Sequence, residues 1–201
     1  MKNLLRIDPR IKIKPEAIEK PVIIRISEFD EESVSKFSDD ISKAHNTGQE
    51  IIPIVIDSYG GSIYDVMSII SEIENSHLLI ATIVVGKAMS AGALLLTYGT
   101  EGYRYVDQNA TIMIHEISAN TYGKNEDVKS DAKEIARLNK FAFGKMARNC
   151  GHKPNYFLEM CHSNKNADCY LTPQQAKKHN LANHVKIPEF ITTVTVETKF
   201  Q

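Results

Sequence analysis

Residues 78–99 read LLIATIVVGKAMSAGALLLTYG and carry a single charge, on Lys87. The stretch is long enough to cross a bilayer, but a lysine in mid-span costs about 2.5–3.5 kcal/mol on insertion scales. Residues 78–85 are rich in isoleucine and valine, as is a strand covered on both faces of a parallel sheet. Gly86 interrupts the run, and an apolar helical segment follows. We therefore expect a buried strand, a glycine turn and a buried helix rather than a membrane span.

Strands and helices are expected to alternate on both sides of this stretch. Asp30 can cap a helix, because the apolar residues after it recur at three- and four-residue steps. Thr172 and Pro173 are typical of another helix start, with Gln175 completing a capping box. Strands separated by such helices imply βαβ crossovers and an α/β fold with a largely parallel sheet. The other expected strands are residues 22–26, 51–56, 103–106 and 111–115, and the other expected helices follow Gly61 and span residues 126–149, with Asn180 and Gly151 as helix stops.

Composition and charge restrict the class of protein. The 201 residues predict one domain, which we place at residues 21–186 between an N-terminal segment, 1–20, and a strand-like extension, 187–201. The 24 basic and 25 acidic residues leave a net charge of −1, so nucleic acid is not expected as a partner. Three cysteines without CxxC spacing argue against a disulfide framework or a zinc site. The N-terminus lacks the apolar region of a secretory signal, and we expect a cytoplasmic protein.

Two glycine-bearing turns are expected at the carboxyl ends of neighbouring strands, where ligands bind in parallel sheets. The first is residues 57–61, DSYGG, and the second is residues 86–92, GKAMSAG. Glycines let backbone N–H groups point at a bound oxygen, and the N-terminus of the next helix adds a favourable dipole. Neither turn matches a nucleotide-binding motif. For the turn at residues 57–61, the alternative is that the glycines only make a tight turn and bind no ligand.

Three side chains are candidates for a nucleophilic site. Ser90 stands where the helix after the second turn begins, although serine is also a common helix cap. A serine hydroxyl needs a base to remove its proton, and the base needs an acid to fix its tautomer. His115 ends the expected strand at residues 111–115, and Asp168 comes shortly before Pro173. Each signal is weak when taken separately, because strand-end histidines and exposed acids are common.

Together, four segments occur in the order seen in the proteolytic subunit of Clp protease, which the chain closely resembles over about residues 21–185. They are DSYGGSI at 57–63, GKAMSAGALLLTYG at 86–99, ATIMIHE at 110–116 and ADCYLTPQQAKKHNLAN at 167–183. The resemblance implies a ClpP/crotonase-like fold and a serine endopeptidase that needs no cofactor or metal. It implies Ser90 as nucleophile, His115 as general base and Asp168 as orienting acid. The backbone N–H groups of Gly61 or Gly60 and of Ala91 would form the oxyanion hole.

The resemblance also has implications for partners. The substrate would be a peptide or unfolded protein, and the chain would form a homo-oligomeric ring, a heptamer or a double ring. Residues 126–149 would be the handle helix that joins two rings. The N-terminal segment does not match the axial loops that contact an AAA+ unfoldase. Whether the chain has an AAA+ unfoldase as a partner is therefore left open. The apolar residues at helical spacing in the handle are expected to face a core: Val128, Ala132, Ile135, Ala142 and Met146.

Several departures from the family pattern keep alternatives open. Residues 118–124 are not the usual glycine-rich segment, and Glu116 and Ile117 replace the usual Gln-Pro after the histidine. Such divergence resembles a phage-encoded or accessory member. The alternatives are a non-catalytic or capsid-maturation ring protein, a crotonase-type acyl-CoA enzyme, and a Ser–Lys enzyme using Lys87. The crotonase alternative requires carboxylates facing the oxyanion hole and a basic rim that binds CoA. For the Ser–Lys alternative, Lys87 is too close to Ser90 in sequence to serve simply as the base.

Overall fold

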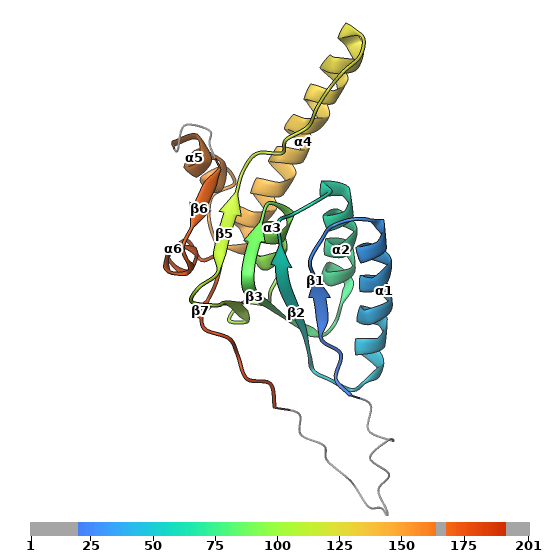
Figure 1. Ribbon diagram of the computed structural model, residues 1–201, viewed down its shortest axis with the longest axis vertical. Coiled ribbons are helices and arrows are strands. Elements are labelled where there is room, and N and C mark those ends of the chain that lie inside the picture. Colours follow the sequence, from blue (N-terminus) through green and yellow to red (C-terminus); the bar gives the residue numbers. More distant parts are fainter. Residues whose placement is uncertain (1–19, 164–167, 192–201) are drawn as a thin grey trace, which may run out of the picture.

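The computed structural model describes residues 20–163 and 168–191, and its architecture is α/β (Figure 1). Within these residues the sheet has the strand order β1-β2-β3-β4-β7, with β5 beside β3 and β6 beside β5. All pairs are parallel except β5 with β6. The expected α/β fold with a largely parallel sheet is therefore confirmed. The strands are β1 (Ile24–Ile26), β2 (Ile51–Ser58), β3 (Leu79–Met89), β4 (Arg104–Val106), β5 (Thr111–Ile114), β6 (Cys169–Leu171) and β7 (His184–Val185), and the helices are α1 (Glu31–Asn46), α2 (Ile63–Asn75), α3 (Ala91–Leu96), α4 (Asn125–Asn149), α5 (Tyr156–Ser163) and α6 (Pro173–Lys178).

The stretch at residues 78–99 forms the middle of the sheet and a helix packed on it. A glycine turn is expected at residues 86–92, but β3 runs to Met89, so the expected start of that turn at Gly86 is wrong and Gly86 lies inside the strand. The strand continues because, beyond Val84, it leaves β4 and pairs with β5 instead. Every residue of α3 is buried. Across the described part of the chain, no helix has both the length and the apolar character that a membrane crossing requires.

The helix ends follow the local signals in the sequence. Asp30 caps α1 by accepting from the Ser33 N–H at 2.8 Å, and Thr172 caps α6 in a capping box with Gln175. Asn180 adopts a left-handed backbone conformation after α6, with φ 56°. The buried residues of α2 belong to one hydrophobic core with residues of β1, β2 and β3, and they are Val66, Ile69, Ile70 and Ile73.

Only the C-terminal part of helix α4 packs against the rest of the fold. Its C-terminal part is buried through Leu138, Phe143, Met146 and Ala147, whereas its N-terminal part extends away from the sheet (Figure 1). The expectation that its whole apolar side faces the core holds for Met146, and Ile135 and Ala142 are half-buried. It is wrong for Val128 and Ala132, which are exposed. Spacing shows which side of a helix is apolar, but this helix is longer than the layer that it covers.

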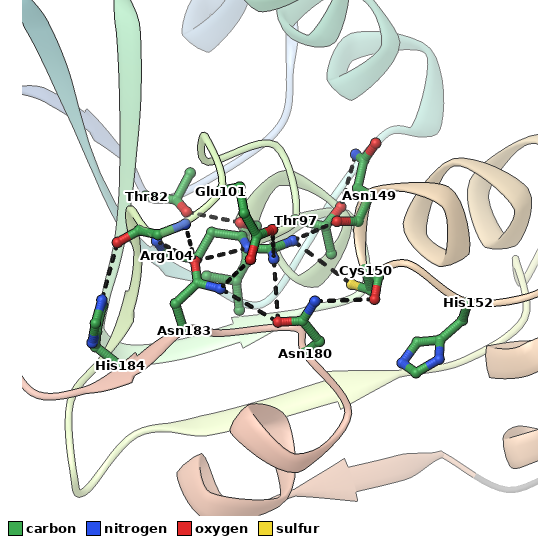
Figure 2. Close-up of polar contacts among 12 residues, drawn as sticks. Thr82, Thr97, Glu101, Arg104, Asn149, Cys150, His152, Asn180, Asn183 and His184 are labelled. Atoms are coloured by element: carbon green, nitrogen blue, oxygen red, sulfur yellow. Dashed lines mark hydrogen bonds and ion pairs between the residues drawn. The ribbon is translucent and has the colours of Figure 1, made fainter.

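A buried arginine joins the C-terminal end of α4 to the sheet (Figure 2). The side chain of Arg104 is 1% exposed. Its guanidinium donates to the Asn149 carbonyl at 2.8 Å, to Asn183 Oδ1 at 3.2 Å and to Glu101 Oε2 at 2.8 Å. A buried charge is tolerated when its donors are paired in this way. The network therefore fixes α4 relative to β4 and to the segment that enters β7.

Only the first residues of the expected C-terminal extension, 187–201, fall within the described residues. The last strand among the described residues is β7, which pairs in parallel with β4 through Tyr105 and His184. Residues 187–191 are not a strand. The rest of the strand-like segment, residues 192–201, and residues 1–19 of the N-terminal segment lie outside the described residues.

Candidate active site

Ser90 occupies a strained turn between β3 and α3. Its backbone has φ 53° and ψ −117°, which is unfavourable for a residue with a side chain. The turn is held by the Ser90 N–H, which donates to the Met113 carbonyl at 2.9 Å, and by the Ser90 carbonyl, which accepts from Ala93 and Leu94. Although Ser90 is at the N-cap position, its hydroxyl makes no cap hydrogen bond with α3. This geometry resembles the strand-to-helix turns that present a nucleophilic hydroxyl at a sheet edge.

His115 and Asp168 meet because β5 and β6 are antiparallel. Ile114 is paired with Cys169, so the next residue outward on β5, His115, lies opposite Asp168. His115 Nδ1 is 3.5 Å from Asp168 Oδ1. This contact is longer than the 2.7–2.9 Å of a charge-assisted hydrogen bond. The two side chains are 24% and 49% exposed, so the pair is open to solvent.

Ser90 and His115 line one small cavity at the carboxyl edge of β3 and β5. The cavity is about 30 Å³, which is room for about one water molecule. Its other lining residues are apolar: Ile63, Ala91, Leu94, Ile114, Ile117, Ala142, Phe143 and Met146. The structure thus brings the expected nucleophile and base to one place.

A larger groove lies next to this cavity. It measures about 370 Å³ and lies between the start of α2, residues 117–121 and α4. Ile63 and Ile117 line both the groove and the cavity, so the two spaces are neighbours. The groove therefore adjoins the cavity that Ser90 and His115 line.

The glycine turn after β2 lies against Ser90. Gly60 has φ 109°, and a Cβ placed there would be 2.7 Å from Ser90 Cβ. Gly61 has φ 154°, and a Cβ there would be 2.6 Å from the Phe29 carbonyl oxygen. Both positions therefore require glycine because other chain segments approach closely. The Gly60 N–H donates to Ser58 Oγ at 3.0 Å.

Lys87 is not available as a general base. Its Nζ lies 2.8 Å from Asp57 Oδ1. The hydrogen bond to Asp57 raises the pKa of Lys87 and lowers the pKa of Asp57, so both groups stay charged near neutral pH. A Ser–Lys enzyme needs a neutral amine to take the serine proton. The Ser–Lys alternative is therefore not supported by the position of Lys87.

The cysteines show no sign of redox or nucleophilic use. Cys150, Cys161 and Cys169 all lie in the described part of the chain, and all are buried free thiols. Burial raises the pKa of Cys150 to about 12 and that of Cys161 to about 11. Thiols with pKa values this high are unreactive near neutral pH. In this structure none of the three cysteines is in a disulfide.

One set of polar contacts beside the site was not anticipated from the sequence. Glu116, the residue after His115, contacts His162 of α5, with Nε2 2.9 Å from Oε1. Asn139 of α4 accepts from the Ile117 N–H at 2.8 Å. Together these contacts hold the chain that leaves His115. Their partners are 22 or more residues apart, so no local spacing could reveal them.

The chain was also compared with models of known protein families. The model of the Clp protease family matches residues 10–188, which is nearly the whole chain. The match includes the turns at Gly60 and Ser90, the histidine at the end of β5 and the acid before β6. Since the α/β sheet and the arrangement of these segments agree with that match, the chain belongs to the Clp protease family, a family of ClpP-type serine peptidases.

Proposed function

We propose that this protein is a serine endopeptidase in which Ser90, His115 and Asp168 form the catalytic triad. The observation that carries the proposal is the strand arrangement at one sheet edge. The β5–β6 register places His115 opposite Asp168, and β5 lies beside the end of β3, where the strained turn holds Ser90. Three weak sequence signals thereby become neighbours in space.

In the proposed reaction, Ser90 Oγ attacks the carbonyl carbon of the scissile peptide bond while His115 takes the hydroxyl proton. Asp168 faces Nδ1 of His115, so Nε2 is the nitrogen left for Ser90. The imidazolium then gives its proton to the leaving amine, and a water activated by His115 hydrolyses the acyl-enzyme. A positioned general base contributes about 10²–10⁴-fold. The 3.5 Å contact with Asp168 is compatible with this role, because such contacts often tighten when substrate binds.

The oxyanion is proposed to accept hydrogen bonds from the N–H groups of Gly61 and Ala91. Gly60 is the weaker candidate, because its N–H already donates to Ser58 Oγ. Ala91 is the first residue of α3, where N–H groups lack acceptors within the helix. One such donor is worth about 10²–10³-fold in kcat. The apolar cavity beside Ser90 would receive a small apolar side chain of the substrate.

A crotonase-type acyl-CoA enzyme fits the site less well. That chemistry needs carboxylates that face the oxyanion hole. Among the described residues that line the cavity beside Ser90, none is acidic. The arrangement of Ser90, His115 and Asp168 would also have no use in that reaction.

Labelling with a fluorophosphonate probe tests the proposal directly. The probe reacts with serines that an adjacent base activates, so we expect one adduct, which peptide mapping places on Ser90. An adduct on another serine would move the nucleophile elsewhere. A protein that takes no label while remaining folded would favour the non-catalytic ring protein instead.

We also propose that the chain assembles into a homo-oligomeric ring through α4. Val128 and Ala132 are exposed on the part of α4 that extends beyond the sheet. Light scattering at micromolar concentration is expected to give a multiple of the 22.6 kDa chain mass. Val128→Glu should weaken the assembly. The control Lys129→Glu, about 100° further around the helix, should leave it intact. A 22.6 kDa particle for the unmodified chain would contradict the ring.

A further inference from the structure

The register between β2 and β3 breaks just before the candidate site. The strands pair residue for residue from Ile51 with Leu79 to Ile56 with Val84, and the next pair is Ser58 with Ala88. Asp57 alone therefore lies opposite residues 85–87. This irregularity is a bulge in β3, and bulges bend a strand and redirect the side chains beyond them. Here the bulge coincides with the place where β3 changes its partner from β4 to β5, just before β3 ends at Met89 and Ser90 follows.

Asp57 of β2 contacts the two bulge residues Gly86 and Lys87. Its carboxylate packs on Gly86, where a Cβ would lie 2.7 Å from Asp57 Oδ1. The same oxygen accepts a hydrogen bond from Lys87 Nζ at 2.8 Å. Glycine at position 86 and lysine at position 87 thus both serve the contact with one carboxylate. This hydrogen bond raises the pKa of Lys87 and lowers the pKa of Asp57, and both shifts keep the pair ionised.

Lys87 also reaches the glycine turn. Its Nζ lies 4.3 Å from the centroid of the Tyr59 ring, which is within the range of a cation–π contact. Tyr59 directly precedes Gly60, and Gly60 is in turn packed against Ser90. The ammonium group of Lys87 therefore contacts both Asp57, near the end of β2, and Tyr59, just before the glycines. Lys87 itself belongs to β3, the strand that directly precedes Ser90.

We propose that Asp57, Tyr59 and Lys87 form a positioning unit that fixes the turn at Gly60 and Gly61 relative to Ser90. The unit acts on the oxyanion donor and the nucleophile and does not touch the reacting atoms. This inference rests on the proposed function. Because Tyr59 is 75% exposed and the ion pair is partly exposed, the unit contributes little to global stability. Its effect should be on geometry, where a displacement of 1 Å can cost about 10²-fold in rate.

Kinetics of the variant Lys87→Met provide the first test. This change removes the charge but keeps the length of the side chain. With a fluorogenic peptide we expect kcat to fall by about 10- to 100-fold and KM to stay within about twofold, since an oxyanion contact acts mainly in the transition state. Lys87→Arg, which can hold both contacts, should restore most of kcat. The matched control is Lys36→Met, which breaks a surface ion pair with Asp40 on α1 and should leave kcat unchanged.

The coupling between the two charges can be tested in the same assay. If Lys87 acts through Asp57, Asp57→Asn should lower kcat to a similar extent, and the double variant should be no worse than either single one. A raised KM with an unchanged kcat would make Lys87 a substrate contact and overturn the proposal. Losses that multiply in the double variant would also overturn it, because the residues would then act independently.

Hydrogen–deuterium exchange separates this inference from the proposed function. In Lys87→Met, the backbone amides of residues 57–61 and 86–90 are expected to exchange faster together, while the melting temperature and the amides of α1 stay unchanged. If the unmodified protein neither reacts with the fluorophosphonate nor hydrolyses peptides, the proposed function fails. The exchange rates of residues 57–61 and 86–90 then still test whether Lys87 holds the two segments together. Unchanged exchange in both segments would overturn it.

Discussion

Replacing Ser90 with alanine is expected to lower peptide hydrolysis by about 10⁶-fold, the loss found when the serine of a catalytic triad is removed. The change deletes a single oxygen and leaves the residue in the same left-handed turn. The fold, the melting temperature and the oligomeric mass should therefore be retained. The measurement is kcat on a fluorogenic peptide, with circular dichroism and light scattering of the same sample.

Two further serine variants make this result specific. Ser68→Ala removes an exposed hydroxyl that bonds within α2, and it should leave hydrolysis unchanged. Ser90→Gly should be as inactive as Ser90→Ala but melt at a higher temperature than it does. Glycine tolerates φ 53°, and strain in such a backbone conformation costs about 1–3 kcal/mol. More than 1% residual activity in Ser90→Ala would place the nucleophile elsewhere.

Replacing Asp168 with asparagine is expected to lower kcat by up to about 10⁴-fold. The amide keeps the size of the side chain but favours the histidine tautomer that cannot accept the serine proton. Asp168 is half exposed, and its contact with His115 is 3.5 Å. An exposed pair of this kind contributes little to stability, so the melting temperature should change by no more than a few degrees. The test measures peptide hydrolysis and thermal melting on the same preparation.

Glu116 provides a matched control for Asp168. It follows His115 in the sequence, but its carboxylate contacts His162 instead. Glu116→Gln should therefore leave kcat within a few-fold of the unmodified protein. If Asp168→Asn instead shows near-normal turnover with an unchanged melting temperature, Asp168 has no catalytic role, and the site is at most a dyad of Ser90 and His115.

Much of the fold could be predicted because its signals are local. The caps at Asp30 and Thr172 and the left-handed stop at Asn180 each depend on a few neighbouring residues, and the structure has all three. The end of β3 could not be predicted in this way. Gly86 looked like a turn residue, but pairing with β5 carries the strand past it, and that partner comes more than 20 residues later in the chain.

By itself, the sequence determined the alternation of strands and helices and the residue types at the candidate site. It identified Ser90, His115 and Asp168 as candidates, and the family resemblance gave them roles. The tertiary structure decided which of these groups meet: His115 opposite Asp168, Gly60 against Ser90, and Lys87 on Asp57. It also decided that half of α4 stands clear of the core. The physical reason is that strand register and bulges set these distances through hydrogen bonds between distant segments, and such bonds leave no mark in the spacing of neighbouring residues.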